Sequence, residues 1–192
     1  MLRGVAGPDT GYTEIADRLA GAGFAALVHG WQVRGNDPPD ADLFTDIRGA
    51  LAFLKARPEV DAGRLAVFGY CKGGGQALLA AVECPELGVV VSFHGFALRQ
   101  QLDAGHPRHP IDVADQLRRP VLILHGEADD VSLLPDMRKL AERLTASGCR
   151  VGFTSYPSAK HGFAVSTHPG FLASAAEDGF SRAVAFVRDH LG

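Results

Sequence analysis

The chain has 192 residues, of which 46% are hydrophobic and 21% charged, with a net charge of −3 at pH 7. These values are typical of one globular domain with a sizeable core, which we expect to span residues 1–192. They exclude a strongly basic nucleic-acid-binding protein, and no apolar run approaches membrane-spanning length. The three cysteines form an odd set without paired spacing, which favours reduced thiols in a cytoplasmic protein.

The first third of the chain predicts a helix, a strand, a loop and a second helix. Apolar residues at helical spacing indicate a helix over residues 9–21. The continuous apolar run Phe24–Val28 predicts a strand buried on both faces. Residues 31–40 contain two prolines and are expected to form a loop, and a second helix is predicted over residues 43–56.

From residue 65 onward, apolar runs of strand length alternate with helical patterns. Strands are predicted over residues 65–68, 88–93, 120–125 and 150–156, with helices after position 71 and over residues 133–147 and 172–191, and a loop-rich segment over residues 96–116. Strands that alternate with helices predict an α/β fold, here a mostly parallel sheet with helices on both faces.

The sequence Gly69-Tyr70-Cys71-Lys72-Gly73 lies between a predicted strand and a predicted helix. This Gly-x-Cys-x-Gly pattern is that of a nucleophile elbow with cysteine in place of serine, because a sharp strand-to-helix turn leaves little room for neighbouring side chains. The helix N-terminus points its N–H groups and dipole at the sulfur, which favours a thiolate. The alternative is a small buried cysteine before a glycine-rich helix. Neither a Walker loop nor a dinucleotide fingerprint fits these residues.

Two further residues complete a catalytic set in the order nucleophile, acid, base. Asp129 follows the predicted strand over residues 120–125, and His161 follows the strand over residues 150–156. Parallel strands bring their carboxyl ends to one edge of a sheet, so we expect Cys71, Asp129 and His161 to meet there. Asp130 is the alternative acid, and Asp129 is then a turn residue.

A metal site built from His94, His106 and His109 is the alternative use of the histidines. No helical His-x3-His or paired-cysteine spacing supports it, so we expect neither a metal nor a cofactor.

With these residues in place, the chain resembles the dienelactone hydrolase family of the α/β-hydrolase fold. The matching segments are residues 68–74 around the elbow, 125–131 around Asp129, 156–163 around His161, and 58–64 before the elbow strand. The resemblance implies hydrolysis of a small ester or lactone by Cys71 through a covalent acyl-enzyme. It also implies an oxyanion hole made by the N–H groups of Lys72 and of Leu2 or Arg3.

The resemblance further implies that Arg34 meets a carboxylate of the substrate, with a solvated loop arginine as the alternative. Val165 stands near the place where members acting on dienelactone tend to carry a second arginine, which argues against a dicarboxylate pocket. Met1 stands where the best-studied members have a glutamate. The strand that precedes the oxyanion loop in this fold is missing, so we expect a gap between residues 24–28 and 65–68, and hypothesise a natural start upstream.

Two other functions stay open at this point. One is a different acyl hydrolase on the same elbow, such as a thioesterase or a short-chain esterase, and the other is a non-catalytic scaffold protein. We expect a small-molecule substrate and no nucleic-acid or membrane partner, and the sequence gives no oligomeric state.

Overall fold

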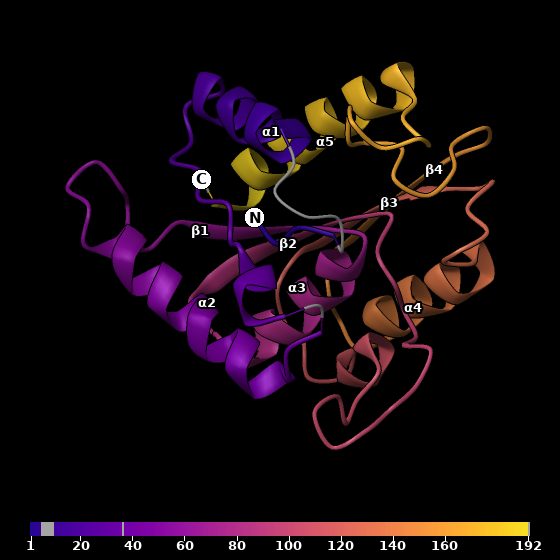
Figure 1. Cartoon of the computed structure of the whole chain (residues 1–192), viewed down its shortest axis with the longest axis horizontal. Helices are drawn as coiled ribbons and strands as arrows, with labels where there is room; N and C mark the ends of the chain where they lie inside the picture. The colour runs from indigo at the N-terminus through magenta and orange to yellow at the C-terminus, as the bar shows by residue number, and fades with distance from the viewer. Residues whose placement is uncertain (5–9, 36, 192) are drawn as a thin grey trace.

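The computed structural model describes residues 1–4, 10–35 and 37–191. At its centre lies a parallel sheet in which the strands follow one another in chain order, β1-β2-β3-β4 (Figure 1). The strands are β1 (Leu65–Tyr70), β2 (Leu87–Phe93), β3 (Val121–Gly126) and β4 (Val151–Tyr156). Since all four run in the same direction, their carboxyl ends share one edge of the sheet.

Helices cover both faces of this sheet (Figure 1). One face carries α2 (Asp40–Lys55), α3 (Lys72–Glu83) and α4 (Leu134–Ala146), and the other carries α1 (Thr10–Gly21) and α5 (Ala173–Leu191). Short 3-10 helices, η1 (Trp31–Arg34) and η2 (Pro110–Val113), lie in the connections. The chain therefore has the α/β architecture with a mostly parallel sheet that the sequence predicts.

Each face of the sheet has its own hydrophobic core. The core under α2, α3 and α4 includes Leu43, Leu78, Ile123, Met137 and Leu140. The core under α1 and α5 includes Leu19, Tyr70, Phe93, Phe163 and Val187. Strands buried on both faces explain why the sequences of β1, β2 and β3 are continuous apolar runs.

One predicted strand is wrong. Residues 24–28 form no strand, and none of the five is buried. Only His29, just beyond the run, forms an isolated parallel bridge, and its partner is Leu2. An apolar run becomes a strand only where a neighbouring strand accepts its hydrogen bonds, and the described chain offers such a neighbour at one position only.

The N-terminal residues lie between this segment and β1. Leu2 bridges His29 on one side and Gly69 on the other, both in parallel register. The Leu2 N–H donates to the Phe68 carbonyl at 2.7 Å, and the Tyr70 N–H donates to the Leu2 carbonyl at 3.0 Å. Alongside lies a cavity of about 370 Å³ lined by residues of 24–27 and 65–68. The expected gap between these two segments is thus present and is bridged at one end by Leu2.

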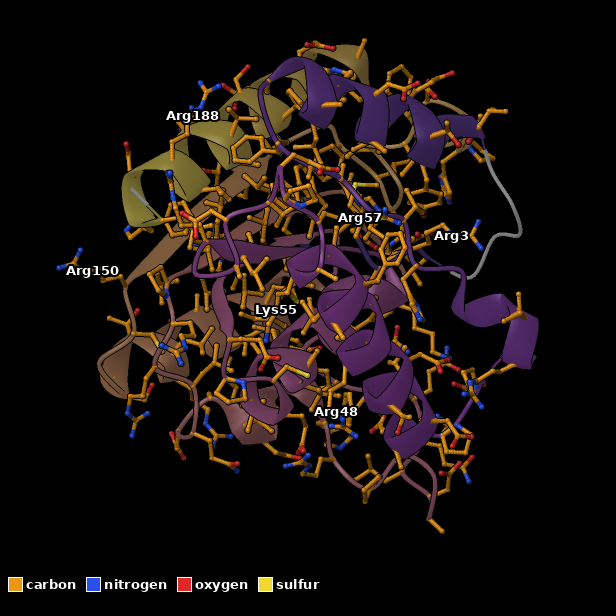
Figure 2. All side chains as sticks on the ribbon, turned by 90° about the vertical axis from the view of Figure 1, so that its left-hand side faces the viewer. Arg3, Arg48, Lys55, Arg57, Arg150 and Arg188 are labelled. Atoms are coloured by element: carbon orange, nitrogen blue, oxygen red, sulfur yellow. The ribbon has the colours of Figure 1, made fainter. Side chains whose placement is uncertain are left out.

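Basic side chains come from many different elements. Figure 2 labels Arg48 and Lys55 on α2, Arg188 on α5, and Arg150 just before β4. Arg188 donates a hydrogen bond to the Ala22 carbonyl at 2.7 Å, which ties α5 to the end of α1. Among the helices of the described residues, none is both long and apolar enough to cross a membrane.

Candidate active site

Cys71 lies at the turn between β1 and α3. Its backbone has φ 55° and ψ −124°, a conformation that costs energy for any residue other than glycine. The Cys71 N–H donates to the Phe93 carbonyl at 3.1 Å, so the neighbouring strand β2 holds the turn in place. The surrounding fold therefore stabilises a strained backbone at the residue that the sequence predicts to be a nucleophile.

The two glycines of the elbow are required by contact with the backbone. A Cβ atom at Gly69 would lie 2.1 Å from the Gly73 carbonyl oxygen. A Cβ atom at Gly73 would lie 2.3 Å from the Leu2 carbonyl oxygen. Real Cβ atoms do not approach backbone oxygens this closely, which is the steric reason for the Gly-x-Cys-x-Gly spacing.

The loop after β4 brings His161 to the sulfur. His161 Nε2 lies 3.0 Å from Cys71 Sγ, and His161 Nδ1 lies 2.8 Å from Asp129 Oδ2. The three residues come from the carboxyl ends of β1, β3 and β4, so the common edge of the sheet assembles them. A thiol, an imidazole and a carboxylate in this arrangement can act chemically as nucleophile, base and orienting acid.

Asp129 is held in a buried position by its own loop. Its Oδ1 accepts hydrogen bonds from the Val131 and Ser132 N–H groups at 2.9 and 2.8 Å. Burial raises the pKa of the Asp129 carboxyl, but the hydrogen bonds from His161 and Ser132 outweigh it and lower the pKa below its usual value. Asp130 is exposed, so Asp129 is the residue that faces His161.

The His161 imidazole has a raised pKa. Burial lowers the pKa of its imidazole, yet the hydrogen bonds with Asp129 and Cys71 outweigh this and raise the pKa from 6.5 to about 9. The Nε2 atom of this imidazole lies 3.0 Å from the sulfur of Cys71.

This shift predicts a pH-dependent part of the stability. Because the folded-state pKa is raised, the pairing of His161 stabilises the fold fully below pH 6.5, and this contribution is lost as the pH rises through about 9. We expect the thermal unfolding midpoint of the wild type to fall over this range relative to that of His161→Gln. A constant difference between the two proteins across the range would contradict the shift.

A cavity of about 540 Å³ opens beside Cys71 and His161. Its size is that of a small-molecule site. Cys71, His161, Lys72, Phe96 and His94 contribute to its wall. The segment over residues 96–116, predicted as loop-rich, supplies several lining residues and contains η2.

Two residues that were predicted to contact the substrate, Arg34 and Leu2, are not placed to do so in the cavity beside Cys71. The Arg34 guanidinium binds Asp46 through two hydrogen bonds of 2.6 and 2.7 Å, and Arg34 does not line the cavity. The Leu2 N–H donates to Phe68 within the sheet, which commits it and makes it unsuitable as an oxyanion donor. Of the two donors that the resemblance implies, Leu2 and Arg3, Arg3 stays a prediction.

Several cavity residues carry no motif in the sequence. His94 has a φ of 36°, and its ring lies 5.1 Å from the His161 ring. Burial holds the pKa of His94 well below its usual range, so this imidazole is neutral. The rings of Phe96 and His168 lie 5.5 and 6.1 Å from that of His161. His94 directly follows β2, and Phe96 lies two residues further along the chain. This position at the carboxyl end of a parallel strand is the signal from which the sequence could have predicted them as site residues.

The histidines named as an alternative metal site are used differently. His94 lines the cavity, His106 contacts Asp103 and Asp37, and His109 Nδ1 accepts a hydrogen bond from the Arg99 N–H. Within residues 1–4, 10–35 and 37–191, no group of three or more metal-ligating side chains is arranged to hold an ion.

Comparison with known proteins places the chain in a family. The model of the family described as "Dienelactone hydrolase family" matches residues 1–191. The chain belongs to the dienelactone hydrolase family. The resemblance read from the elbow and the segments around Asp129 and His161 is thereby confirmed.

Individual members of the dienelactone hydrolase family agree with this assignment. A "Putative carboxymethylenebutenolidase" of Methylorubrum extorquens is 34% identical over 79% of this chain and 52% of its own length, so the chain spans about half of that relative. One of the same description from Salmonella typhimurium is 29% identical over 93% of this chain and 72% of its own. The crystal structure of a "Putative Dienelactone Hydrolase" from Klebsiella pneumoniae superposes with a TM-score of 0.89 at 26% identity, over 97% of this chain and 84% of that one.

Proposed function

We propose that the chain hydrolyses small esters or lactones with Cys71 as nucleophile, His161 as base and Asp129 as the orienting acid. The observation that carries this proposal is the continuous set of contacts from Asp129 Oδ2 through the imidazole to Cys71 Sγ, at 2.8 and 3.0 Å. Membership of the dienelactone hydrolase family and the 540 Å³ cavity support the same substrate class.

The proposed reaction begins with attack of the Cys71 thiolate on the carbonyl carbon. A bond forms between sulfur and carbon, and the charge on the carbonyl oxygen is stabilised by the N–H groups of Lys72 and Arg3. When the ester C–O bond breaks, the leaving oxygen takes the proton from His161. In a lactone this oxygen stays attached, because the ring opens.

Water completes the cycle. His161 takes a proton from the water, whose oxygen attacks the thioester carbon, and the carbon–sulfur bond breaks to restore the thiolate. The product is a carboxylic acid. All three cysteines are free thiols, and the proposed chemistry needs Cys71 in this form. A reducing compartment such as the cytoplasm would keep them reduced.

The acyl-enzyme is the intermediate that tests this mechanism. We expect rapid quenching of a reaction with p-nitrophenyl hexanoate to trap a hexanoyl group on the peptide that contains Cys71, as read by mass spectrometry. Cys84 and Cys149 are buried and serve as internal controls. Turnover of the ester without acylation of Cys71 would contradict the mechanism.

A panel of thioesters, short-chain esters and lactones separates the proposed activity from the other acyl hydrolases on this elbow. A preference for thioesters over both other classes would favour a thioesterase. No turnover of any member, together with slow alkylation of Cys71, would favour the scaffold protein.

A further inference from the structure

The wall of the cavity beside Cys71 already binds a carboxylate of the same chain. Oδ1 of Asp37 forms an ion pair with the Lys72 ammonium and lies 3.1 Å from His106 Nε2. Lys72 directly follows the nucleophile and forms the first residue of α3. All three residues line the same cavity as Cys71 and His161.

The two donors are largely buried, whereas the carboxylate is exposed. The side chains of Lys72 and His106 are 17% and 9% exposed, but that of Asp37 is 58% exposed. Two further contacts hold His106 in place. Asp103 Oδ1 lies 3.0 Å from its Nδ1, and the Pro38 carbonyl oxygen lies 3.1 Å from its Nε2, the nitrogen that also faces Asp37. The donors therefore belong to the wall, and Asp37 reaches them from the surface.

The arginine of the wall is neutralised in the same way. Arg99 lines the cavity, and its guanidinium binds Asp40 at 2.6 Å, with both side chains largely buried. Lys72 and Arg99 are the lysine and arginine among the described lining residues, so each already faces a carboxylate of the chain. A carboxylate on a substrate would enter next to Asp37 and Asp103 and would be repelled by both.

We propose that Asp37 determines specificity by occupying the anion position of the cavity. The site then selects esters and lactones whose acyl part is uncharged, and disfavours those that carry a carboxylate. The inference rests on the proposed hydrolase function, and it assigns to Asp37 a role that depends on its charge and on its contact with Lys72 and His106.

The test compares two substrates that differ only at the far end of the acyl chain. In p-nitrophenyl hexanoate this end is a methyl group, and in mono-p-nitrophenyl adipate it is a carboxylate. For the wild type we expect the higher kcat/KM with hexanoate. In Asp37→Asn the ratio of adipate to hexanoate should rise by at least about tenfold, because Lys72 loses the carboxylate that neutralises it.

Controls separate this effect from net charge and from loop structure. Asp115→Asn removes the same charge at an exposed position that pairs with Arg143, and it should leave the ratio unchanged. Asp37→Ala should behave like Asp37→Asn. An equal change in kcat/KM for both substrates would show that Asp37 only supports the loop, and would overturn the inference, as would a wild type that prefers adipate.

A binding experiment keeps the inference testable without turnover. Hexanamide and adipamate carry the same two far ends on an unreactive amide, and their affinities can be measured by calorimetry. We expect Asp37→Asn to bind adipamate at least about tenfold more tightly than the wild type does. Failure of ester hydrolysis alone would count against the proposed function, whereas unchanged adipamate affinity would count against Asp37.

Discussion

Replacement of Cys71 by alanine is expected to lower kcat/KM for p-nitrophenyl hexanoate by at least about a thousandfold. The reason is that the covalent route disappears: His161 loses the sulfur at 3.0 Å, and the Lys72 N–H has no intermediate to stabilise. The measurement is the steady-state release of p-nitrophenol by the purified variant. We expect the variant to hydrolyse the ester no faster than free imidazole does.

Matched variants make this result specific to the sulfur at the elbow. Cys84→Ala removes a thiol of the same size from the buried end of α3 and should keep nearly full activity. Cys71→Ser keeps the hydrogen-bonding geometry but holds its proton more tightly, so a small residual activity is expected. If Cys71→Ala kept more than about a tenth of the wild-type activity, the nucleophile would have to be sought elsewhere.

Much of the site could be predicted because its geometry depends on the spacing of residues that are close together in the sequence. The glycines on either side of Cys71 are there for steric reasons, and steric limits on a turn depend on residues close in sequence. Asp129 and His161 are separated by 32 residues, yet each lies in the loop that follows a strand. Parallel strands place such positions together, so the topology supplied the long-range contact that spacing alone lacks.

The choice between Asp129 and Asp130 shows what local spacing cannot determine. Both follow the same strand, and one residue decides which carboxylate points inward. The structure selects Asp129 because its Oδ1 is fixed by two N–H groups of the turn, which leaves Oδ2 directed at His161. That detail depends on the dihedral angles of the loop, which the sequence does not specify by itself.

The strand predicted at residues 24–28 and the substrate contact predicted for Arg34 differ from the structure for a common physical reason. The run Phe24–Val28 has the composition of a buried strand, but strand formation needs a partner, and composition does not report whether one is present. Arg34 has the chemistry to bind a carboxylate, and it does so with Asp46, twelve residues later on α2. A cation in a sequence is available to a substrate only if no acid of the chain reaches it first.

The role of Asp37 leaves no signal in the sequence. This residue lies in a polar, proline-rich loop where an aspartate is unremarkable, and its partners Lys72 and His106 follow 35 and 69 residues later. Only the fold shows that these three side chains meet in the cavity that holds Cys71.

Replacement of His161 by glutamine should lower both the activity and the reactivity of the thiol. Glutamine can accept or donate a hydrogen bond at this position but cannot hold the proton of Cys71, so the thiolate loses its partner. We expect a loss of about a thousandfold in kcat/KM. Alkylation of Cys71 by iodoacetamide near neutral pH should slow by at least about tenfold, while Cys84 and Cys149, both buried, stay slow in either protein.

The double variant Cys71→Ala/His161→Gln then distinguishes a catalytic pair from two separate contributions. Groups that act as a unit are not additive, so the double variant should be no slower than Cys71→Ala within about a factor of three. Multiplying losses would mean that His161 aids the reaction without serving Cys71, and unchanged alkylation in His161→Gln would mean that the imidazole does not sustain the thiolate. Either result would show that the 3.0 Å contact between His161 Nε2 and Cys71 Sγ does not have the catalytic role that we propose for it.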